Sequence, residues 1–215
     1  MFVIRFALLS SLFYALNVSM IPLIYTLEVS AFLFLFIRFG TTFFTSLVIT
    51  KSLFSYNKIK QQKLGLWVLI LSLLFGVQSW LYVEAVKYMS VGLASVVLFT
   101  YPLITYLIVS LNSRRKLDVS TILMFLLAII GIAAISQSED GFYTMAIGIV
   151  LAILSAISYS LILIITPKMS ALKNWEIVKY TTLIPALGFL YLFLNESSFY
   201  WPDNQALILS LVSGV

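Results

Sequence analysis

Long runs of apolar residues, separated by short polar segments, extend along the whole chain. A helix that crosses the hydrocarbon core of a bilayer needs about 20 predominantly apolar residues. Seven runs approach or exceed that length and predict membrane-spanning helices; they cover residues 6–26, 30–50, 64–86, 91–111, 119–137, 143–166 and 177–194. An eighth run starts at Ala206 and has ten residues up to Val215. The pattern predicts an all-α integral membrane protein, a polytopic helical bundle with seven complete spans and a partial eighth.

The composition supports the same class of protein. Hydrophobic residues make up 62% of the chain and charged residues 10%, whereas a soluble domain has about 45–50% apolar and about 25% charged residues. A transmembrane barrel is the rival for such a composition, but its strands alternate apolar and polar residues over about ten positions. The runs in this chain are continuous and longer, which favours helices.

Basic residues lie in every second loop, which predicts the orientation of the chain. Ten of the 13 Lys and Arg residues fall within 51–63, 114–116 and 168–179. The intervening loops hold acidic residues, namely Glu28, Glu139, Asp140, Glu196 and Asp203. Because basic loops stay on the cytoplasmic side, we predict a cytoplasmic N-terminus in a plasma membrane, the inner membrane of a bacterium. The net charge of +5 is then an orientation signal rather than a nucleic-acid site; binding of anionic lipid is the alternative.

An internal repeat relates the first and sixth predicted spans. Residues 7–22 align with 152–167, and six of the sixteen positions are identical, including Tyr14 with Tyr159. Small residues four apart, which favour close helix packing, recur in both copies as Ala7, Ser11, Ala15 and Ser19 and as Gly148, Ala152, Ala156 and Ser160. Five crossings separate the two spans, so they run in opposite directions. This predicts inverted-topology repeats, an architecture of many secondary transporters that bind substrate between the halves.

The segment YVEAVKYMSVGLASVVLFTYPLITYLIV, residues 82–109, carries a family resemblance. Its Ala85 and Tyr88, its small residues at 92–95 and its Tyr101–Pro102 pair resemble the third-to-fourth-span hairpin of EamA-type transporters, in the drug/metabolite transporter superfamily. The first span, and the second span with its Arg38–Phe39 pair, also resemble that family.

The resemblance implies ten spans in two five-span halves, with both termini cytoplasmic. Residues 1–138 would form the first EamA-like repeat, and 143–215 an incomplete second repeat of two complete spans and part of a third. The counterparts of the spans in 64–138 would fall beyond Val215. We therefore expect a chain that is truncated at the C-terminus.

Polar residues within the predicted spans are candidates for a substrate cavity. A charge inside the membrane is costly and usually faces a cavity or a partner, and Arg38 lies well inside the second span with Thr42 on its face. Gln78 and Tyr82 lie one helical turn apart in the third span. The full set of cavity candidates is Tyr14, Asn17, Arg38, Gln78, Tyr82 and Tyr159. The alternative for Arg38 is a structural role, either snorkelling to the interface or pairing with Glu84.

Two further groups of residues are interpreted as structural or gating elements. Glu84 and Lys87 lie one turn apart at the outer end of the third span, where they can pair, and Gly92 permits a tight hairpin. Tyr101–Pro102 is expected to kink the fourth span, because proline removes a backbone hydrogen bond. We interpret both groups as structural turns, and a role in gating is the alternative.

The residue types present argue against an enzyme. The chain has no histidine and no cysteine, which removes the usual general base and the thiolate metal ligands. An intramembrane aspartyl enzyme needs two aspartates within spans, but the aspartates, Asp118, Asp140 and Asp203, fall in predicted loops. We expect no catalytic residues, no metal site and no cofactor.

The interpretation is a secondary-active transporter or exporter of small metabolites that works by alternating access in the lipid bilayer. Arg38 and the aromatic candidates favour an amphipathic substrate with an anionic group. The alternative is a truncated, non-transporting membrane protein, or an assembly partner that completes its fold by oligomerisation. The sequence does not decide whether the protein forms homo-oligomers, and no nucleic-acid partner is expected.

Overall fold

The computed structural model describes residues 17–27, 29–50, 64–113, 119–120, 123–124, 126–127, 130–131, 142–170 and 172–196. Within these ranges the regular secondary structure is helical, without strands. The elements are α2 (Ile21–Thr26), α3 (Ala31–Thr50), α5 (Gly65–Ala85), α6 (Val91–Leu98), α7 (Tyr101–Asn112), α9 (Phe142–Ile165), the 3₁₀ helix η1 (Thr166–Met169) and α10 (Asn174–Leu194).

Five helical segments are long and apolar enough to cross a membrane. They are Ala31–Thr50, Gly65–Ala85, Val91–Asn112, Met145–Met169 and Asn174–Leu194. They coincide with the second, third, fourth, sixth and seventh predicted spans, which confirms a helical membrane protein. The first predicted span is described only from Asn17 onward, the fifth only in part, and the eighth lies outside the described residues. Seven complete spans and the inverted repeat therefore stay predictions.

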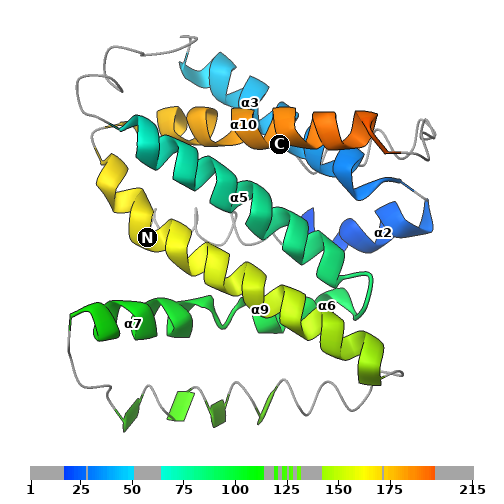
Figure 1. The fold of residues 1–215 in the computed structure, drawn as a ribbon, viewed down its shortest axis with the longest axis vertical. Helices are drawn as coiled ribbons and strands as arrows, with labels where there is room; N and C mark the ends of the chain where they lie inside the picture. Colours follow the sequence, from blue (N-terminus) through cyan, green and yellow to red (C-terminus); the bar gives the residue numbers. More distant parts are fainter. Residues whose placement is uncertain are drawn as a thin grey trace, which may run out of the picture.

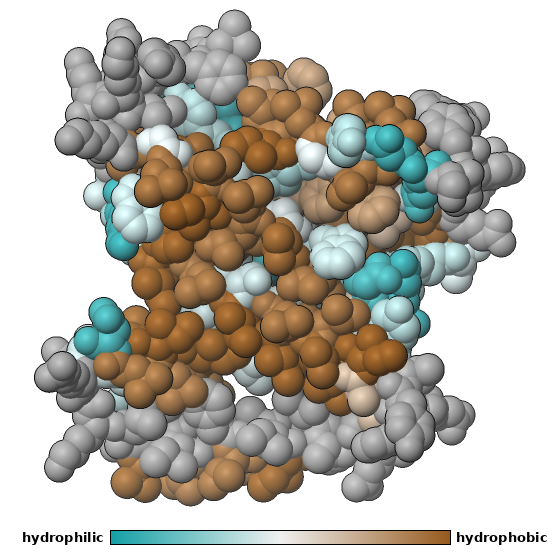
Figure 2. All heavy atoms as spheres, in the orientation of Figure 1, coloured by the Kyte–Doolittle hydropathy of each residue, from teal (hydrophilic) through white to brown (hydrophobic). Residues whose placement is uncertain are grey.

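The helices form a bundle with α5 near its middle (Figure 1). One side of α5 faces α10, which packs extensively against α3, and another side faces α9, which also contacts α6 and α7. Helices α3, α7 and α9 end, and α5 and α10 begin, on the left of Figure 1, which we name the basic end after its loops. The opposite side, where α5 and α10 end, is the acidic end. On the face seen in Figure 2, hydrophobic residues cover most of the coloured surface between these ends.

Small residues on α9 allow the close helix packing that the sequence predicts. Gly148, Ala152, Ala156 and Ser160 are all buried. A Cβ atom on Gly148 would lie 3.2 Å from the carbonyl oxygen of Ala85 and 3.1 Å from the Cβ atom of Tyr88. Further along α9, the Ser160 hydroxyl donates to the carbonyl oxygen of Tyr101 at 2.9 Å. The small-residue ridge is thus a packing surface that holds α9 against α5 and α7.

The fourth span is broken where the sequence places Tyr101–Pro102. Helix α6 ends at Leu98 and α7 begins at Tyr101. Pro102 lies in the first turn of α7, where its missing N–H does least harm, and it cannot donate to the carbonyl of Leu98. The helix is thus interrupted where the sequence predicts a kink, and Tyr101 at the start of α7 contacts α9.

Candidate functional site

A cavity of about 760 Å³ lies within the bundle, a size typical of small-molecule sites, which measure about 300–1,000 Å³. It is lined by residues of α2, α3, α5, α6, α7, α9 and α10, of the α6–α7 break and of the segment that leads into α2. The lining residues are Val18, Ser19, Ile21, Arg38, Phe39, Thr42, Phe75, Gln78, Ser79, Tyr82, Val91, Gly92, Ser95, Leu98, Phe99, Tyr101, Tyr159, Val178, Thr181 and Thr182.

Helix α3 supplies the charge of the cavity. Arg38 is the single charged side chain among the described lining residues. One turn further on, Thr42 also lines the cavity, and its hydroxyl donates to the Arg38 carbonyl oxygen at 2.8 Å. This local bond satisfies the hydroxyl within the helix. Tyr82 of α5 lines the same cavity as Arg38.

Helix α5 carries polar groups whose hydrogen bonds are already made within the protein. The Gln78 side-chain amide donates to the Ser155 hydroxyl at 3.3 Å, and that hydroxyl donates to the Gln78 carbonyl oxygen at 2.9 Å. The Tyr82 hydroxyl lies 2.8 Å from the Ser95 oxygen. Ser95 donates its own hydrogen to the carbonyl of Val91, so Tyr82 is the donor to Ser95. These bonds fix the polar side chains of α5 against α9 and α6.

Aromatic rings from α7 and α9 form another wall of the cavity. The rings of Tyr101 and Tyr159 meet edge to face, with centroids 4.6 Å apart and planes at 75°. This is a favourable geometry for two aromatic rings. Phe99, in the α6–α7 break, lines the same cavity. The break therefore not only interrupts the span but also places the side chains of Phe99 and Tyr101 at the cavity.

The structure brings four of the six cavity candidates together. Arg38, Gln78, Tyr82 and Tyr159 all line the one cavity. Asn17 is described but is not among the lining residues, although its neighbours Val18 and Ser19 are; Tyr14 lies outside the described residues.

Sequence reasoning missed other lining residues. Thr181 and Thr182 reach the cavity from α10, and Tyr101, expected only to kink or gate, lines it as well. A pair of threonines within an apolar run was the available signal for α10. The lining role of Tyr101 depends on how the broken span packs against α9, which its own sequence does not reveal.

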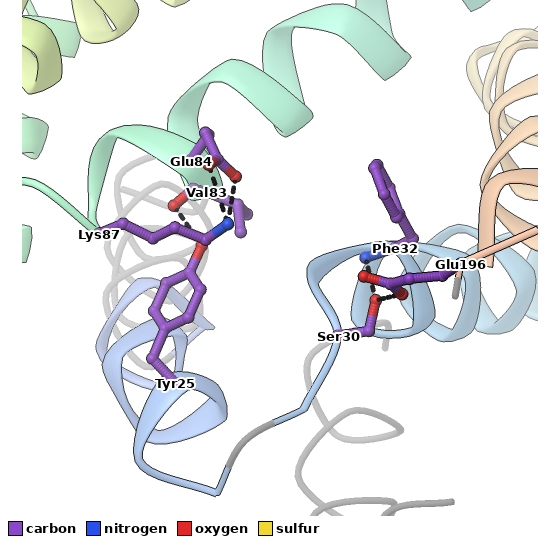
Figure 3. Close-up of polar contacts among 7 residues, drawn as sticks. All are labelled: Tyr25, Ser30, Phe32, Val83, Glu84, Lys87 and Glu196. Atoms are coloured by element: carbon purple, nitrogen blue, oxygen red, sulfur yellow. Dashed lines mark hydrogen bonds and ion pairs between the residues drawn. The ribbon is translucent and has the colours of Figure 1, made fainter. Parts of the chain in front are cut away.

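The predicted pair of Glu84 and Lys87 forms at the acidic end, outside the cavity lining (Figure 3). The Lys87 ammonium lies 2.7 and 2.8 Å from the two oxygens of the Glu84 carboxylate. It also lies 5.5 Å from the ring centroid of Tyr25, whose hydroxyl donates to the Val83 carbonyl at 2.7 Å. Both carboxylate oxygens of Glu84 therefore contact Lys87 rather than Arg38.

A second charged cluster, which the sequence analysis did not predict, lies at the basic end. Lys179 belongs to α10, and it has 0% of its surface exposed. Its ammonium donates to the Thr50 hydroxyl of α3 at 3.3 Å, and the buried Glu176 lies one turn earlier on the same helix. Glu176 in turn accepts the Lys173 backbone N–H at 2.9 Å and so caps the helix.

The described residues contain no group of three or more His, Cys, Asp or Glu side chains that could hold a metal ion. The features that are present define a helical membrane protein with a cavity of solute size inside its bundle.

Comparison with known proteins identifies the family to which this membrane protein belongs. The model of the EamA-like transporter family matches residues 1–137 of the 215-residue chain, which is more than half of it. The chain belongs to the EamA-like transporter family, as its hairpin and second-span motifs predict. No curated protein and no solved structure shows a significant match.

Proposed function

We propose that the protein is a secondary-active transporter that moves small metabolites across the membrane by alternating access, with the cavity as its substrate site. The observation that supports this most directly is the origin of the lining residues. Helices α3, α5, α6 and α7 belong to the predicted first repeat, residues 1–138, and α9 and α10 to the predicted second repeat, residues 143–215. Transporters built from inverted repeats bind substrate between the repeats.

Alternating access requires contacts between the halves that break at one end while they hold at the other. At the acidic end, Ser30 of the first half donates to the Glu196 carboxylate of the second (Figure 3). At the basic end, Lys179 donates to Thr50, and the Lys168 ammonium lies 3.8 Å from the ring centroid of Trp67. Each contact joins the two predicted halves, so each is a candidate for a contact that changes during transport.

The orientation belongs to the same proposal, with the basic end cytoplasmic in a plasma membrane, the inner membrane of a bacterium. The absence of native cysteines makes a direct test simple. Ser170→Cys at the basic end and Asn195→Cys at the acidic end both replace exposed residues. In intact cells, a membrane-impermeant maleimide should label the Asn195→Cys variant and spare the Ser170→Cys variant. Labelling in the reverse order would overturn the orientation.

The transport proposal is tested by filling the cavity. Thr42→Trp places an indole in the cavity from α3, whereas Val48→Trp changes the same helix at a residue that is 76% exposed on the apolar surface. In proteoliposomes, with a panel of radiolabelled metabolites, the wild type and Val48→Trp should take up the same solute. Thr42→Trp should lose at least about tenfold of that flux, because a blocked site removes substrate binding.

Two results of this experiment would count against the proposal. Equal flux through Thr42→Trp would mean that the cavity is not the substrate site. No flux of any solute through a correctly folded wild type would instead favour the alternative, a membrane protein that assembles with partners and does not transport.

A further inference from the structure

The two walls of the cavity differ in chemistry. The charge of the cavity is on α3, at Arg38, whereas the aromatic pair Tyr101 and Tyr159 is on α7 and α9. Helix α5 packs against α9 on one side and against α10 and α3 on another (Figure 1), and its residues Gln78 and Tyr82 line the same cavity. A molecule in the cavity therefore meets a cationic group at one wall and aromatic rings at the other.

The charged wall selects for the sign of the ligand. The described lining residues include one guanidinium and no carboxylate, so they bring a positive charge to the cavity. A guanidinium binds a carboxylate through two parallel hydrogen bonds. An ammonium group would meet repulsion from Arg38 and would find no acidic partner among these residues. One arginine also matches one acidic group better than two.

The remaining polar groups make few demands on the ligand. Gln78 is bonded to Ser155, and Tyr82 is bonded to Ser95. Because these two side chains already have partners, a ligand body without hydrogen-bonding groups leaves neither of them unsatisfied. Phe39, Phe75 and Phe99 complete an apolar lining around them. Rings such as those of Tyr101 and Tyr159 pack well against a flat aromatic body.

We infer that the cavity takes aromatic monocarboxylates, with the carboxylate at Arg38 and the ring against Tyr101 and Tyr159. This inference rests on the proposed function for the identity of the site and adds the class of substrate. It excludes cationic aromatic amines and predicts a clear preference over neutral molecules of the same shape.

Four probes of similar size test the class: indole-3-acetate, its neutral amide indole-3-acetamide, the cation tryptamine, and the non-aromatic carboxylate octanoate. Binding is measured by titration of the full chain in lipid nanodiscs. Indole-3-acetate should bind on the order of tenfold more tightly than the amide, since a charge-assisted bidentate contact is lost with the amide. Octanoate should bind more weakly than indole-3-acetate, and tryptamine should bind most weakly.

Substitutions test separately what each wall contributes to binding. Arg38→Gln should bring the affinities for acid and amide to within about twofold of each other by removing the charge, and Arg38→Lys should restore part of the preference. Tyr159→Leu should weaken acid and amide alike and leave their ratio unchanged. A general loss of structure would not produce these opposite patterns. Val48→Trp serves as the control that changes neither.

Some outcomes would overturn the class. These are equal binding of acid and amide to the wild type, stronger binding of tryptamine, an unchanged ratio in Arg38→Gln, or binding of none of the four probes. Failure of the proposed function is a separate result, read from flux in proteoliposomes. Preferential binding of the acid without its transport would support the proposed ligand class and overturn the proposed transport function. Transport of tryptamine in preference to the acid would support transport and overturn the ligand class.

Discussion

The same four-residue pattern, Glu-x-Val-Lys, occurs at both ends of the bundle and behaves differently at each. At the acidic end it is Glu84–Lys87, which follows the last turn of α5, and the lysine is 39% exposed. At the basic end it is Glu176–Lys179, in the first turns of α10, where α3 packs over the lysine and leaves 0% of it exposed.

From this difference we expect burial, not the motif, to decide how much the charges contribute to stability. An exposed pair is worth only about 0–1 kcal/mol, because water solvates each charge as well as the partner does. Removing one partner of a buried pair costs about 3–5 kcal/mol, because the remaining charge is left without compensation. From the sequence alone, Lys87 is the lysine that departs from the charge pattern, since it lies on the acidic side, whereas Lys179 is one of the basic residues of 168–179 that follow the pattern. In the structure the unusual lysine is Lys179.

Lys179→Met is expected to have the largest effect. It should lower the free energy of unfolding by about 3–5 kcal/mol, because it removes a buried positive charge close to the buried carboxylate of Glu176. Equilibrium unfolding in mixed micelles measures this. The double variant Glu176→Gln/Lys179→Met should recover part of the loss, since it removes both charges while the glutamine can still cap α10. A single variant as stable as the wild type would contradict the burial of this cluster.

Gly148→Ala tests what holds the turn at the acidic end in place. The added Cβ would lie 3.2 Å from the Ala85 carbonyl oxygen and 3.1 Å from the Tyr88 Cβ atom, so α9 and the turn must move apart. Overpacking of this kind costs about 1–3 kcal/mol. The measurement is again equilibrium unfolding, with Gly188→Ala as the matched control, because nothing lies within 4 Å of the corresponding Cβ there. Equal stability of the two variants would show that α9 does not pack closely on the turn.

Lys87→Met should have the smallest effect. The loss of an exposed pair is expected to change the free energy of unfolding by less than about 1 kcal/mol, and raised salt should reduce the difference further because it screens the pair. Transport by this variant should match the wild type if the pair is a structural turn. A drop in flux with unchanged stability would instead support the gating alternative. A stability loss as large as that of Lys179→Met would remove the contrast between the two ends.

Length and hydrophobicity made much of the described fold predictable from the sequence. The second and third spans, expected at 30–50 and 64–86, are observed at Ala31–Thr50 and Gly65–Ala85. The seventh was expected to begin at Ile177, but α10 begins at Asn174. The helix therefore also includes Asn174, Trp175 and Glu176, and Glu176 caps its first turn. The sequence pattern assigns these residues to the preceding loop.

The candidate site was predictable where a polar residue interrupts an apolar helix. Arg38 and Gln78 are such residues, and both line the cavity. The lining by Tyr101 and the burial of Lys179 depend on helices that pack from elsewhere in the chain, α9 and α3. No local pattern carries that information. The inverted repeat stays a prediction, because Tyr14 and most of the first span lie outside the described residues.

The most direct test of alternating access is to fix the two predicted halves to each other at one end. Ser30→Cys/Glu196→Cys replaces the contact between α3 and the end of α10 in a chain without other cysteines, and a short bis-maleimide can bridge the pair. The measurement is solute flux in proteoliposomes before and after cross-linking, with the two single-cysteine variants as controls. The proposal predicts that cross-linking abolishes flux in the double variant and leaves the single variants active. Full flux through the cross-linked protein would contradict alternating access between these halves.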